Sequence, residues 1–409
     1  MNVYKRWIEH SVCEALKTWR IVSIAGARQC GKTTLSKLIP QTGIIRRSLD
    51  EAMYLQSATE DPENFVYHPQ DITLFIDEIQ KAPTLLPAIK RMVDESNSPG
   101  QFLLTGSANL HAVPDATESL AGRLHSTRLR TLTEGEIRGT SPTFPLKAFS
   151  GDFSPRIENG GKKEIISLAF RGGYPEPIRI ATGKRAIWHN DYLSHLLRHD
   201  IADVCDIRRL DKLHDIFMFL ASRSSKFLNI AEIAAALEIS KISAENYISA
   251  LEAMFLFDRV SAWTPRDYDR AIKRPKWFIG DTGLMCAALK WREDDVLFDS
   301  DKNGKLVETW VYHELAAAVD CLDSFTLFHY RDREKREIDF ILENDAGELV
   351  GIEVKSGSLV GTDDFKHMDW VSSNLCNGRW KRSIVLHSGS DTLSFGHNRL
   401  AVPLAALFT

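Results

Sequence analysis

The stretch Gly26–Thr34 has the residue types and the spacing of a phosphate-binding loop. Its sequence, Gly-Ala-Arg-Gln-Cys-Gly-Lys-Thr-Thr, fits the pattern G-x-x-x-x-G-K-[S/T]. Gly26 and Gly31 permit tight turns, so that backbone N–H groups can converge on phosphate oxygens. In such a loop Lys32 reaches the β- and γ-phosphates and the Thr33 hydroxyl binds Mg²⁺. The residues predicted to bind a nucleoside triphosphate are Gly26, Ala27, Arg28, Gln29, Cys30, Gly31, Lys32, Thr33 and Thr34.

A strand and a helix must hold this loop in place. Ile21–Ala25, directly before the loop, is an apolar run suited to a buried parallel strand. The apolar residues after Lys32 have helical spacing, and the positive end of that helix favours phosphate. An ordinary glycine turn before a helix is the alternative, and the strand–loop–helix context argues against it.

Two acids end a second apolar run, Ile72–Glu78. Functional groups in a parallel sheet gather at the carboxyl ends of the strands, so these acids should face the loop. Asp77 would hold Mg²⁺ directly or through water, and Glu78 would polarise the attacking water. The second acid favours hydrolysis over binding alone, because a carboxylate near the γ-phosphate can take the proton of the water. A solvated acidic strand end is the alternative.

Two further features accompany these acids. A third strand, Gln101–Ser107, ends in hydroxyl groups that could sense the γ-phosphate. Arg123 follows Gly122 and has two interpretations: an arginine finger donated to a neighbouring subunit, or an ordinary surface arginine. The first interpretation implies a homo-oligomer, and the sequence does not choose between them.

Composition limits the class of protein. The chain has 409 residues, of which 44% are hydrophobic and 26% charged, as in soluble globular proteins with two or three domains. No apolar run reaches membrane-spanning length, and the first six residues lack the apolar core of a signal peptide. The six cysteines form no C-x-x-C pair, which favours reduced thiols. We therefore expect a cytoplasmic protein with no membrane contact. Its net charge of −4 requires any nucleic-acid contact to be local.

Shifts in composition predict four regions. A passage rich in Gly, Pro and Ser at 140–163 closes the nucleotide-binding domain, and mostly helical sequence follows it. The expected regions are an α/β ATPase domain at 1–150, a helical connector at 151–205, a winged-helix-like domain at 206–285 and a nuclease-like α/β domain at 286–409.

The third region has helical spacing with two capping signals. Asn229 is expected to cap one helix, and Ser240 or Ser243 to open the next, which resembles a helix-turn-helix with a wing after it. Its third helix carries Glu245 and Glu252 and lacks an Arg/Asn pair for base edges, so the region either contacts DNA phosphates or serves as a packing module. The basic residues available for phosphate contacts are Lys241, Arg266, Arg270, Lys273, Arg274 and Lys276.

A second group of chemically suited residues lies near the C-terminus. Asp339 precedes a turn at 344–347, and Glu353 and Lys355 share one face of the strand that returns. If the hairpin register aligns them, two carboxylates could hold a metal ion and the lysine could orient a water. Glu308, on an amphipathic helix, could add a further carboxylate. This set suits metal-assisted phosphodiester hydrolysis, whereas a solvated hairpin is the alternative.

The order of motifs along the chain resembles the prokaryotic AAA-type ATPases that carry a C-terminal domain of unknown function. The motifs that carry the resemblance are Tyr4-Lys5-Arg6, Gly26 to Thr34, Phe75 to Glu78, Leu104 to Ser107, Ser119 to Arg123, Gly172 to Pro175, Ile279 to Leu284 and Ile352 to Ser356. In that family the C-terminal part resembles a winged helix followed by a PD-(D/E)XK restriction-endonuclease fold.

The resemblance implies ATP as the nucleotide and a nuclease-like site at Glu308, Asp339, Glu353 and Lys355, with Mg²⁺ or Mn²⁺ as its metal. Ile338 stands where the name of the superfamily has Pro. Two functions remain open. One is an ATP-driven enzyme that acts on DNA through a metal-dependent nuclease. The other is an ATPase switch whose silent C-terminal domain binds DNA or protein.

Overall fold

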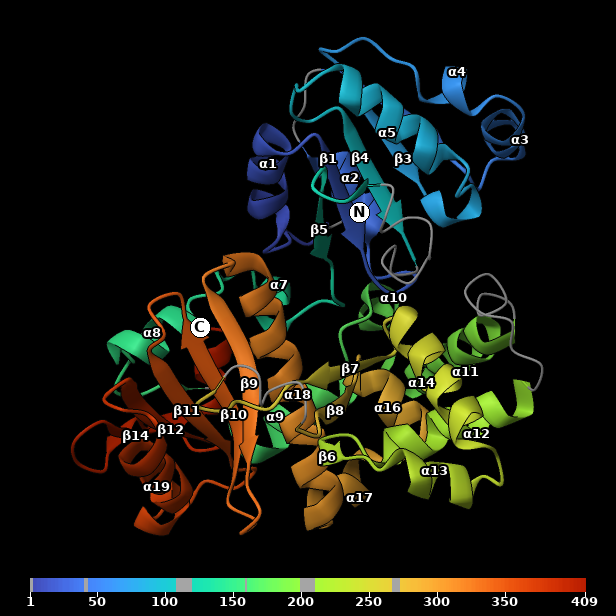
Figure 1. Cartoon of the computed structure of the whole chain (residues 1–409). Helices are drawn as coiled ribbons and strands as arrows, with labels where there is room; N and C mark the ends of the chain where they lie inside the picture. Colours follow the sequence, from blue (N-terminus) through green and yellow to red (C-terminus); the bar gives the residue numbers. More distant parts are fainter. Residues whose placement is uncertain (1–2, 40–42, 108–119, 159, 199–209, 267–272) are drawn as a thin grey trace.

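The computed structural model describes residues 3–39, 43–107, 120–158, 160–198, 210–266 and 273–409 (Figure 1). Within these residues the strands form sheets of five, six and three strands. In Figure 1 the five-stranded sheet, in blue and teal, and the six-stranded sheet, in orange and red, lie apart, and the green and yellow helices stand beside the latter. Ser119 and Arg270, named above, lie outside the described residues.

The N-terminal sheet is entirely parallel and carries the phosphate-binding loop. Its strands are β1 (Ile21–Ala25), β2 (Ile44–Ser48), β3 (Thr73–Asp77), β4 (Phe102–Gly106) and β5 (Leu124–Arg128), in the order β2-β3-β4-β1-β5. All residues of β1, β3 and β4 are buried, as expected of central strands covered on both faces. This is the α/β architecture predicted from the sequence.

Helices cover both faces of this sheet. They are α1 (Glu9–Thr18), α2 (Lys32–Leu38), α3 (Ala52–Glu60), α4 (Pro62–Val66) and α5 (Leu85–Glu95), with a 3₁₀ turn at Ile79–Lys81. Alternation along β1 divides the core: Ile21 packs in the cluster that contains α5, while Val22 and Ile24 pack with α1. The phosphate-binding loop and the acids Asp77 and Glu78 therefore lie at the same edge of a rigid, buried sheet.

The chain then passes through short helices that leave the first sheet. They are α7 (Glu134–Arg138), α8 (Phe144–Ser150), α9 (Lys162–Arg171), α10 (Pro175–Arg179) and α11 (Thr182–Arg198). Phe144 and Ala148 of α8 are buried in the core of the C-terminal domain, not in that of the N-terminal sheet. Packing thus changes before position 150, while the boundaries at 150, 205 and 285 stay predictions.

Helices and a small sheet follow, in the order expected of a helix-turn-helix with a wing. The elements are α12 (Leu210–Ser222), β6 (Lys226–Phe227), α13 (Ile230–Ala236), α14 (Lys241–Ala253), β7 (Phe257–Val260) and β8 (Lys276–Ile279). Asn229 and Ser240 cap α13 and α14 through their side-chain oxygens, which confirms the prediction for Asn229 and selects Ser240 over Ser243. The three strands pair antiparallel in the order β6-β8-β7, here called the wing sheet. Its assignment to the winged-helix fold stays a prediction.

The wing sheet lies between two hydrophobic cores. Trp277 and Ile279 of β8 pack among the helices of the preceding region. Phe278 points the other way and stacks on Tyr312, with ring centroids 4.3 Å apart, and it also contacts Phe340. Because side chains alternate along a strand, Lys276 shares the face of Phe278 and is directed toward the C-terminal domain.

The C-terminal domain is a mixed sheet between helices. Helix α16 (Thr282–Ala288) precedes it and packs mainly on the helices before the wing sheet, through Leu284 and Met285. The domain itself comprises α17 (Glu293–Phe298), α18 (Ser300–Leu322), β9 (Phe325–Arg331), β10 (Glu337–Asn344), β11 (Leu349–Val354), α19 (Lys366–Leu375), β12 (Trp380–His387), β13 (Leu393–Ser394) and β14 (Arg399–Pro403). The strand order is β13-β14-β12-β11-β10-β9. The core on one face of this sheet contains residues of α18, and the core on the other contains residues of α19.

Two further observations concern the whole described chain. None of its described helices is both long and apolar enough to cross a lipid bilayer. Its described cysteines are free thiols, at positions 13, 30, 286, 321 and 376.

Candidate functional site

Both glycines of the phosphate-binding loop are required by its geometry. A Cβ atom at Gly26 would lie 2.2 Å from the carbonyl oxygen of Leu129, which follows β5. Gly31 has φ +109°, a backbone conformation that other residues rarely adopt. The loop therefore folds tightly against the sheet and delivers the chain directly into α2.

Lys32 and Thr33 contact the groups that the sequence places around a triphosphate. The Lys32 ammonium is buried and donates to the carbonyl oxygens of Gly26, at 2.8 Å, and Ala27, at 3.0 Å. The Thr33 hydroxyl donates to Oδ2 of Asp77 at 2.8 Å. Thr105, at the end of β4, donates to the other oxygen of the same carboxylate. The two predicted Mg²⁺ ligands, Thr33 and Asp77, are thus in contact.

Glu78 is fixed in an unusual conformation beside these residues. Its backbone has φ 56°, a left-handed conformation that strains a residue with a side chain by about 1 kcal/mol or more. Oε2 of Glu78 accepts hydrogen bonds from Nε2 of Gln80, at 2.5 Å, and from the backbone N–H of Ser107, at 3.2 Å. Gln80 also donates to the Ser107 hydroxyl at 2.8 Å. Glu78 and Ser107 were predicted from the sequence, whereas nothing in the sequence marked Gln80, which joins them.

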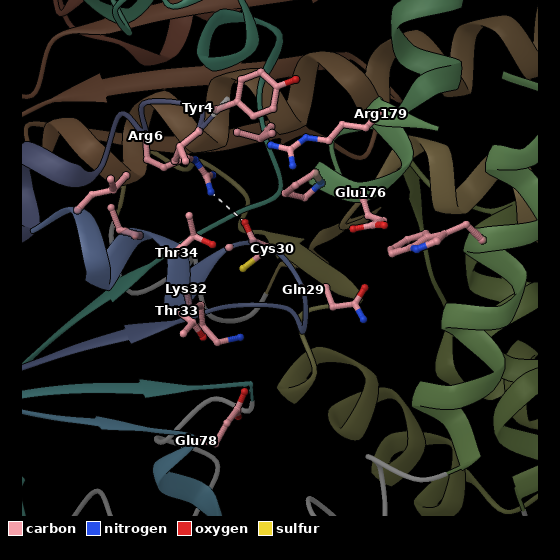
Figure 2. Close-up of a pocket in the computed structure, with 17 residues that line it drawn as sticks. Tyr4, Arg6, Gln29, Cys30, Lys32, Thr33, Thr34, Glu78, Glu176 and Arg179 are labelled. Carbon is pink, nitrogen blue, oxygen red and sulfur yellow. Dashed lines mark hydrogen bonds between the residues drawn. The ribbon is translucent and has the colours of Figure 1, made fainter. Parts of the chain in front are cut away.

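A cavity of about 530 Å³ opens over the loop (Figure 2). Three segments line it: the N-terminal residues 3–6, the loop with the start of α2, and residues 175–188 of α10 and α11. In Figure 2, Tyr4, Arg179 and Glu176 border the cavity on the side away from Glu78. Its volume suits a small-molecule ligand. In the sequence, Gly172 to Pro175 were quoted only as part of a motif, and the residues after them only as mostly helical.

Arg6 connects the loop to the segment that follows β5. Its buried guanidinium donates to the carbonyl oxygens of Cys30, at 3.0 Å, and Arg130, at 2.7 Å, and to Oε1 of Glu136, at 3.0 Å. The contact with Cys30 is the dashed line in Figure 2. Arg6 was quoted in the sequence only as part of a motif, because nothing local reveals partners 124 and 130 positions away.

The helices of the connector also hold the loop. Tyr192 of α11 donates to the carbonyl oxygen of Arg28 at 2.8 Å, and its hydroxyl lies 3.0 Å from that of Tyr174. The Arg179 guanidinium lies over the Tyr4 ring, 5.8 Å from its centroid. The cavity is therefore closed by side chains from outside the parallel sheet.

Arg123 does not line this cavity. Its guanidinium makes a two-point contact with Asp94: Nε lies 2.5 Å from Oδ1, and Nη2 lies 2.9 Å from Oδ2. Within its own chain Arg123 thus forms a surface ion pair with Asp94. Donation to a neighbouring subunit stays a prediction.

The predicted C-terminal site contains a residue that the sequence placed elsewhere. The side chain of Lys276 is 1% exposed, and its Nζ lies 2.9 Å from Oδ1 of Asp339, 2.5 Å from Oε1 of Glu308 and 2.9 Å from Oε1 of Glu337. Burial alone would lower the pKa of Lys276, but Asp339, Glu308 and Glu337 raise it well above its ordinary value. The prediction that Lys276 contacts nucleic-acid phosphates is wrong, because its ammonium is enclosed by carboxylates.

The hairpin register brings Glu353 close to Asp339. Phe340 pairs with Ile352, which places Glu353 opposite Asp339, and the N–H of Val354 donates to Oδ2 of Asp339 at 3.0 Å. Burial and then the charge of Asp339 raise the pKa of Glu353 well above its ordinary value. The same two causes raise the pKa of Glu308 to about 8.

Lys355 is the fourth predicted residue of this site. Lys355 follows β11, is half-buried, and pairs through Nζ with Oδ1 of Asp364 at 3.1 Å. Across the residues that the structure describes, no group of three or more His, Cys, Asp or Glu residues is arranged to hold a metal ion. The predicted ligands Glu308, Asp339 and Glu353 are close together, and an ammonium lies among them.

Comparisons with known proteins support the first domain and leave the others open. Residues 18–138 match a family described as an AAA domain, while 162–295 and 303–407 match two domains of unknown function, DUF8612 and DUF4143. Uncharacterized proteins of Mycobacterium bovis and Mycobacterium tuberculosis are each 26% identical over 411 residues, which cover 97% of this chain and 82% of each relative.

Solved structures resemble the chain only distantly. A point variant of RuvB from Thermotoga maritima is 20% identical with a TM-score of 0.27, covering 62% of this chain and 87% of that one. PCH-2 of C. elegans is 12% identical with a TM-score of 0.23, covering 57% and 60%. Scores this low carry no argument of their own.

The parallel sheet, the loop between β1 and α2 and the sequence match agree over the same residues. The chain therefore contains an AAA-type ATPase domain with the P-loop fold, followed by a helical region and a mixed-sheet domain.

Proposed function

We propose that the protein is a cytoplasmic, Mg²⁺-dependent ATP hydrolase. Nucleotide binding and hydrolysis change the conformation of its C-terminal domain. The observation that carries the proposal is the contact of the Thr33 hydroxyl with Asp77 at 2.8 Å, beside the cavity that Lys32 and Glu78 line. The residues that would bind phosphate and those that would support hydrolysis thus lie at one place.

Lys32 and the loop amides bind the phosphates. To do so, the ammonium exchanges the carbonyl oxygens of Gly26 and Ala27 for anionic phosphate oxygens, which form stronger, charge-assisted hydrogen bonds. Thr33 and Asp77 would hold Mg²⁺, which neutralises charge on the phosphates when bound. Their oxygens are hard ligands of the kind that Mg²⁺ prefers.

Glu78 acts as the general base. The Glu78 carboxylate first releases its hydrogen bonds from Gln80 and the Ser107 N–H. It then accepts the proton of the attacking water. Ser107 lies at the end of β4, where its hydroxyl can respond to the γ-phosphate. The nucleoside lies on the other side of the cavity, against Tyr4 and Trp188.

Nucleotide binding tests this proposal directly. Titration of a fluorescent ATP analogue should show saturable binding to the wild type, and Lys32→Ala should lose it. Lys37→Ala, an exposed lysine on the same helix, is the matched control and should bind as the wild type does. A wild type with no affinity for any nucleoside triphosphate would refute the proposal.

A short segment after β5 supports the coupling to the C-terminal domain. Leu129 donates its N–H to the Ala25 carbonyl at 2.8 Å, directly before the loop. Its neighbours Arg128 and Arg130 both bind Asp258 of β7, at 2.6 and 2.7 Å. A displacement of the loop therefore reaches the wing sheet through three consecutive residues.

The same segment contacts the C-terminal domain. Arg130 also donates to Oδ2 of Asp320 at 2.6 Å, and Tyr312 donates to Oδ2 of Asp258 at 2.8 Å. Asp320 and Tyr312 both belong to α18. Strand β5, the wing sheet and α18 thus share one partly buried network of charges, which gives nucleotide-driven motion a direct route.

Nuclease activity of the C-terminal domain is a second candidate function. The approach of Glu308, Asp339 and Glu353 favours it, and the Lys276 ammonium among them opposes it. We infer that the domain binds DNA or a protein without cleavage while Lys276 is docked.

A plasmid-nicking assay separates the two functions of the C-terminal domain. The wild type should leave supercoiled DNA intact in Mg²⁺ or Mn²⁺, with or without ATP. Nicking by the wild type that Asp339→Ala abolishes would instead establish the nuclease, and an Asp345→Ala control would exclude a general effect of losing an acid.

A further inference from the structure

Lys276 reaches the carboxylate cluster from a different part of the molecule. Glu308 comes from α18 and both Glu337 and Asp339 from β10, whereas Lys276 belongs to the wing sheet. Three carboxylate oxygens lie within 2.5–2.9 Å of its Nζ. The cluster is thus assembled from two domains, and its only cation among these four side chains belongs to the wing sheet.

This arrangement has the form of a cation site. Divalent metal ions take carboxylate oxygens at separations of about 2.0–2.6 Å, only slightly shorter than those around Nζ. Buried carboxylates so close together repel one another unless a positive charge lies among them. The ammonium supplies that charge from within the chain, in the space that a metal ion would need.

The backbone fixes the position of Lys276. Lys276 pairs with Phe227 of β6 on one side and with Val260 of β7 on the other, so β8 is the central strand. The Phe227 ring lies 5.9 Å from Nζ, a contact that favours a cation. The lysine is thus not a surface side chain that happens to fold inward.

Neighbouring contacts attach the wing sheet to the C-terminal domain. The Trp263 N–H donates to the His329 carbonyl at 2.7 Å, and the His329 N–H donates to the Ser261 carbonyl at 3.0 Å. Phe278, two residues after Lys276, stacks on Tyr312. Withdrawal of Lys276 therefore requires the wing sheet to separate from β9 and α18.

We propose that Lys276 is a tethered cation that takes the place of a divalent metal ion, so that docking of the wing sheet and metal binding exclude each other. The residues present thus do not fit a resident Mg²⁺ or Mn²⁺ in the docked conformation. The proposal does not depend on ATP hydrolysis, since it rests only on the contacts of Lys276.

Mn²⁺ binding to the full-length, nucleotide-free chain tests this proposal, with free Mn²⁺ followed by electron paramagnetic resonance. The wild type and Asp339→Asn should bind equally weakly. Lys276→Met should gain about one Mn²⁺ per chain with at least roughly tenfold tighter binding, because its carboxylates lose their internal cation. Lys276→Met combined with Asp339→Asn should lose that gain. Lys290→Met, which replaces an exposed lysine just after α16, should behave as the wild type does.

Thermal unfolding gives a second, independent readout. In chelator, Lys276→Met should unfold at a lower temperature than the wild type, and Mn²⁺ should restore part of the difference. Should the variant not fold in chelator, recovery in Mn²⁺ but not in NaCl of equal ionic strength would support the proposal equally.

Three outcomes would overturn the proposal. The first is one wild-type Mn²⁺ site that Asp339→Asn removes. The second is a folded Lys276→Met that binds no more Mn²⁺ than the wild type. The third is a Lys276→Met chain that Mn²⁺ fails to return to the folded state.

Discussion

The Thr33 hydroxyl and the Asp77 carboxylate meet at 2.8 Å, although β4 separates the strands that lead to them. The contact is possible because parallel strands end at the same edge of the sheet. Thr105, at the end of β4, occupies the intervening position and binds the second oxygen of Asp77. Asp77 is thereby oriented before any ligand arrives, which is what a fixed metal ligand requires.

Replacing Glu78 should separate binding from turnover. Glu78→Gln should bind ATP with nearly wild-type affinity and lower kcat by about 10²–10⁴-fold, because an amide cannot accept the proton of the water. Phosphate release and binding of a fluorescent nucleotide measure the two effects. Glu51→Gln, an exposed glutamate in the same domain, is the control. Normal hydrolysis by Glu78→Gln would show that Glu78 is not the base.

Mixing two inactive proteins should reveal whether Arg123 acts between subunits. The Arg123→Ala protein has an intact phosphate-binding loop, and the Lys32→Ala protein has an intact Arg123. An interface between the two variants would therefore combine a working loop with a working Arg123. We expect ATPase activity to recover on mixing.

Arg91→Ala is the matched control for Arg123, because Arg91 makes another exposed ion pair, with Glu63. It should retain activity, since such pairs contribute only about 0–1 kcal/mol. No loss of activity in Arg123→Ala would leave Arg123 as a surface residue.

Asp258 should be critical to stability because two arginines depend on it. Burial would raise the pKa of Asp258, but Arg128 and Arg130 lower it strongly. Asp258→Asn should lower the free energy of unfolding by about 3–5 kcal/mol, because it removes the carboxylate that Arg128 and Arg130 share and leaves the nearly buried Arg130 with Asp320 alone. Asp320→Asn removes a more exposed partner of Arg130 alone and should have a smaller effect. Urea unfolding would measure both, and equal losses would contradict this account.

His329 should make the chain less stable in acid. Burial, and then the Lys276 charge, lower the pKa of His329 from its usual 6.5 to about 3. The folded state keeps the ring neutral where the unfolded state protonates it. The contribution of His329 is therefore present above pH 6.5 and is lost as the pH falls from 6.5 toward 3.

There is a limit to how steeply His329 can change the free energy of unfolding with pH. One proton changes the free energy of unfolding by at most about 1.4 kcal/mol per pH unit. His329→Gln should flatten the decline of stability between pH 6.5 and 4 in urea unfolding, whereas the exposed His397→Gln should not. The same slope in both variants would contradict the assignment.

The nucleotide site could be predicted from the sequence because its parts are local. Loop, flanking strand and flanking helix are contiguous, and Asp77 and Glu78 end an apolar run of their own. The β10–β11 hairpin was predictable for the same reason, since the turn at 344–347 sets its register.

Residues that depend on distant contacts escaped prediction. Arg6 is buried by partners in the loop and beyond β5, and Lys276 by carboxylates 32 to 63 positions away. Both look like ordinary basic residues in the sequence. Their contacts form only when segments far apart in the chain pack together, which periodicity and spacing do not encode.

The two apolar faces of β8 also bear on how the chain can be divided. Trp277 and Ile279 belong to one core and Phe278 to another, so a chain cut at 285 leaves Phe278 facing water in one fragment and Tyr312 uncovered in the other. Fragments made at that junction should aggregate or unfold. The helical region and the mixed-sheet domain should therefore unfold as one cooperative unit.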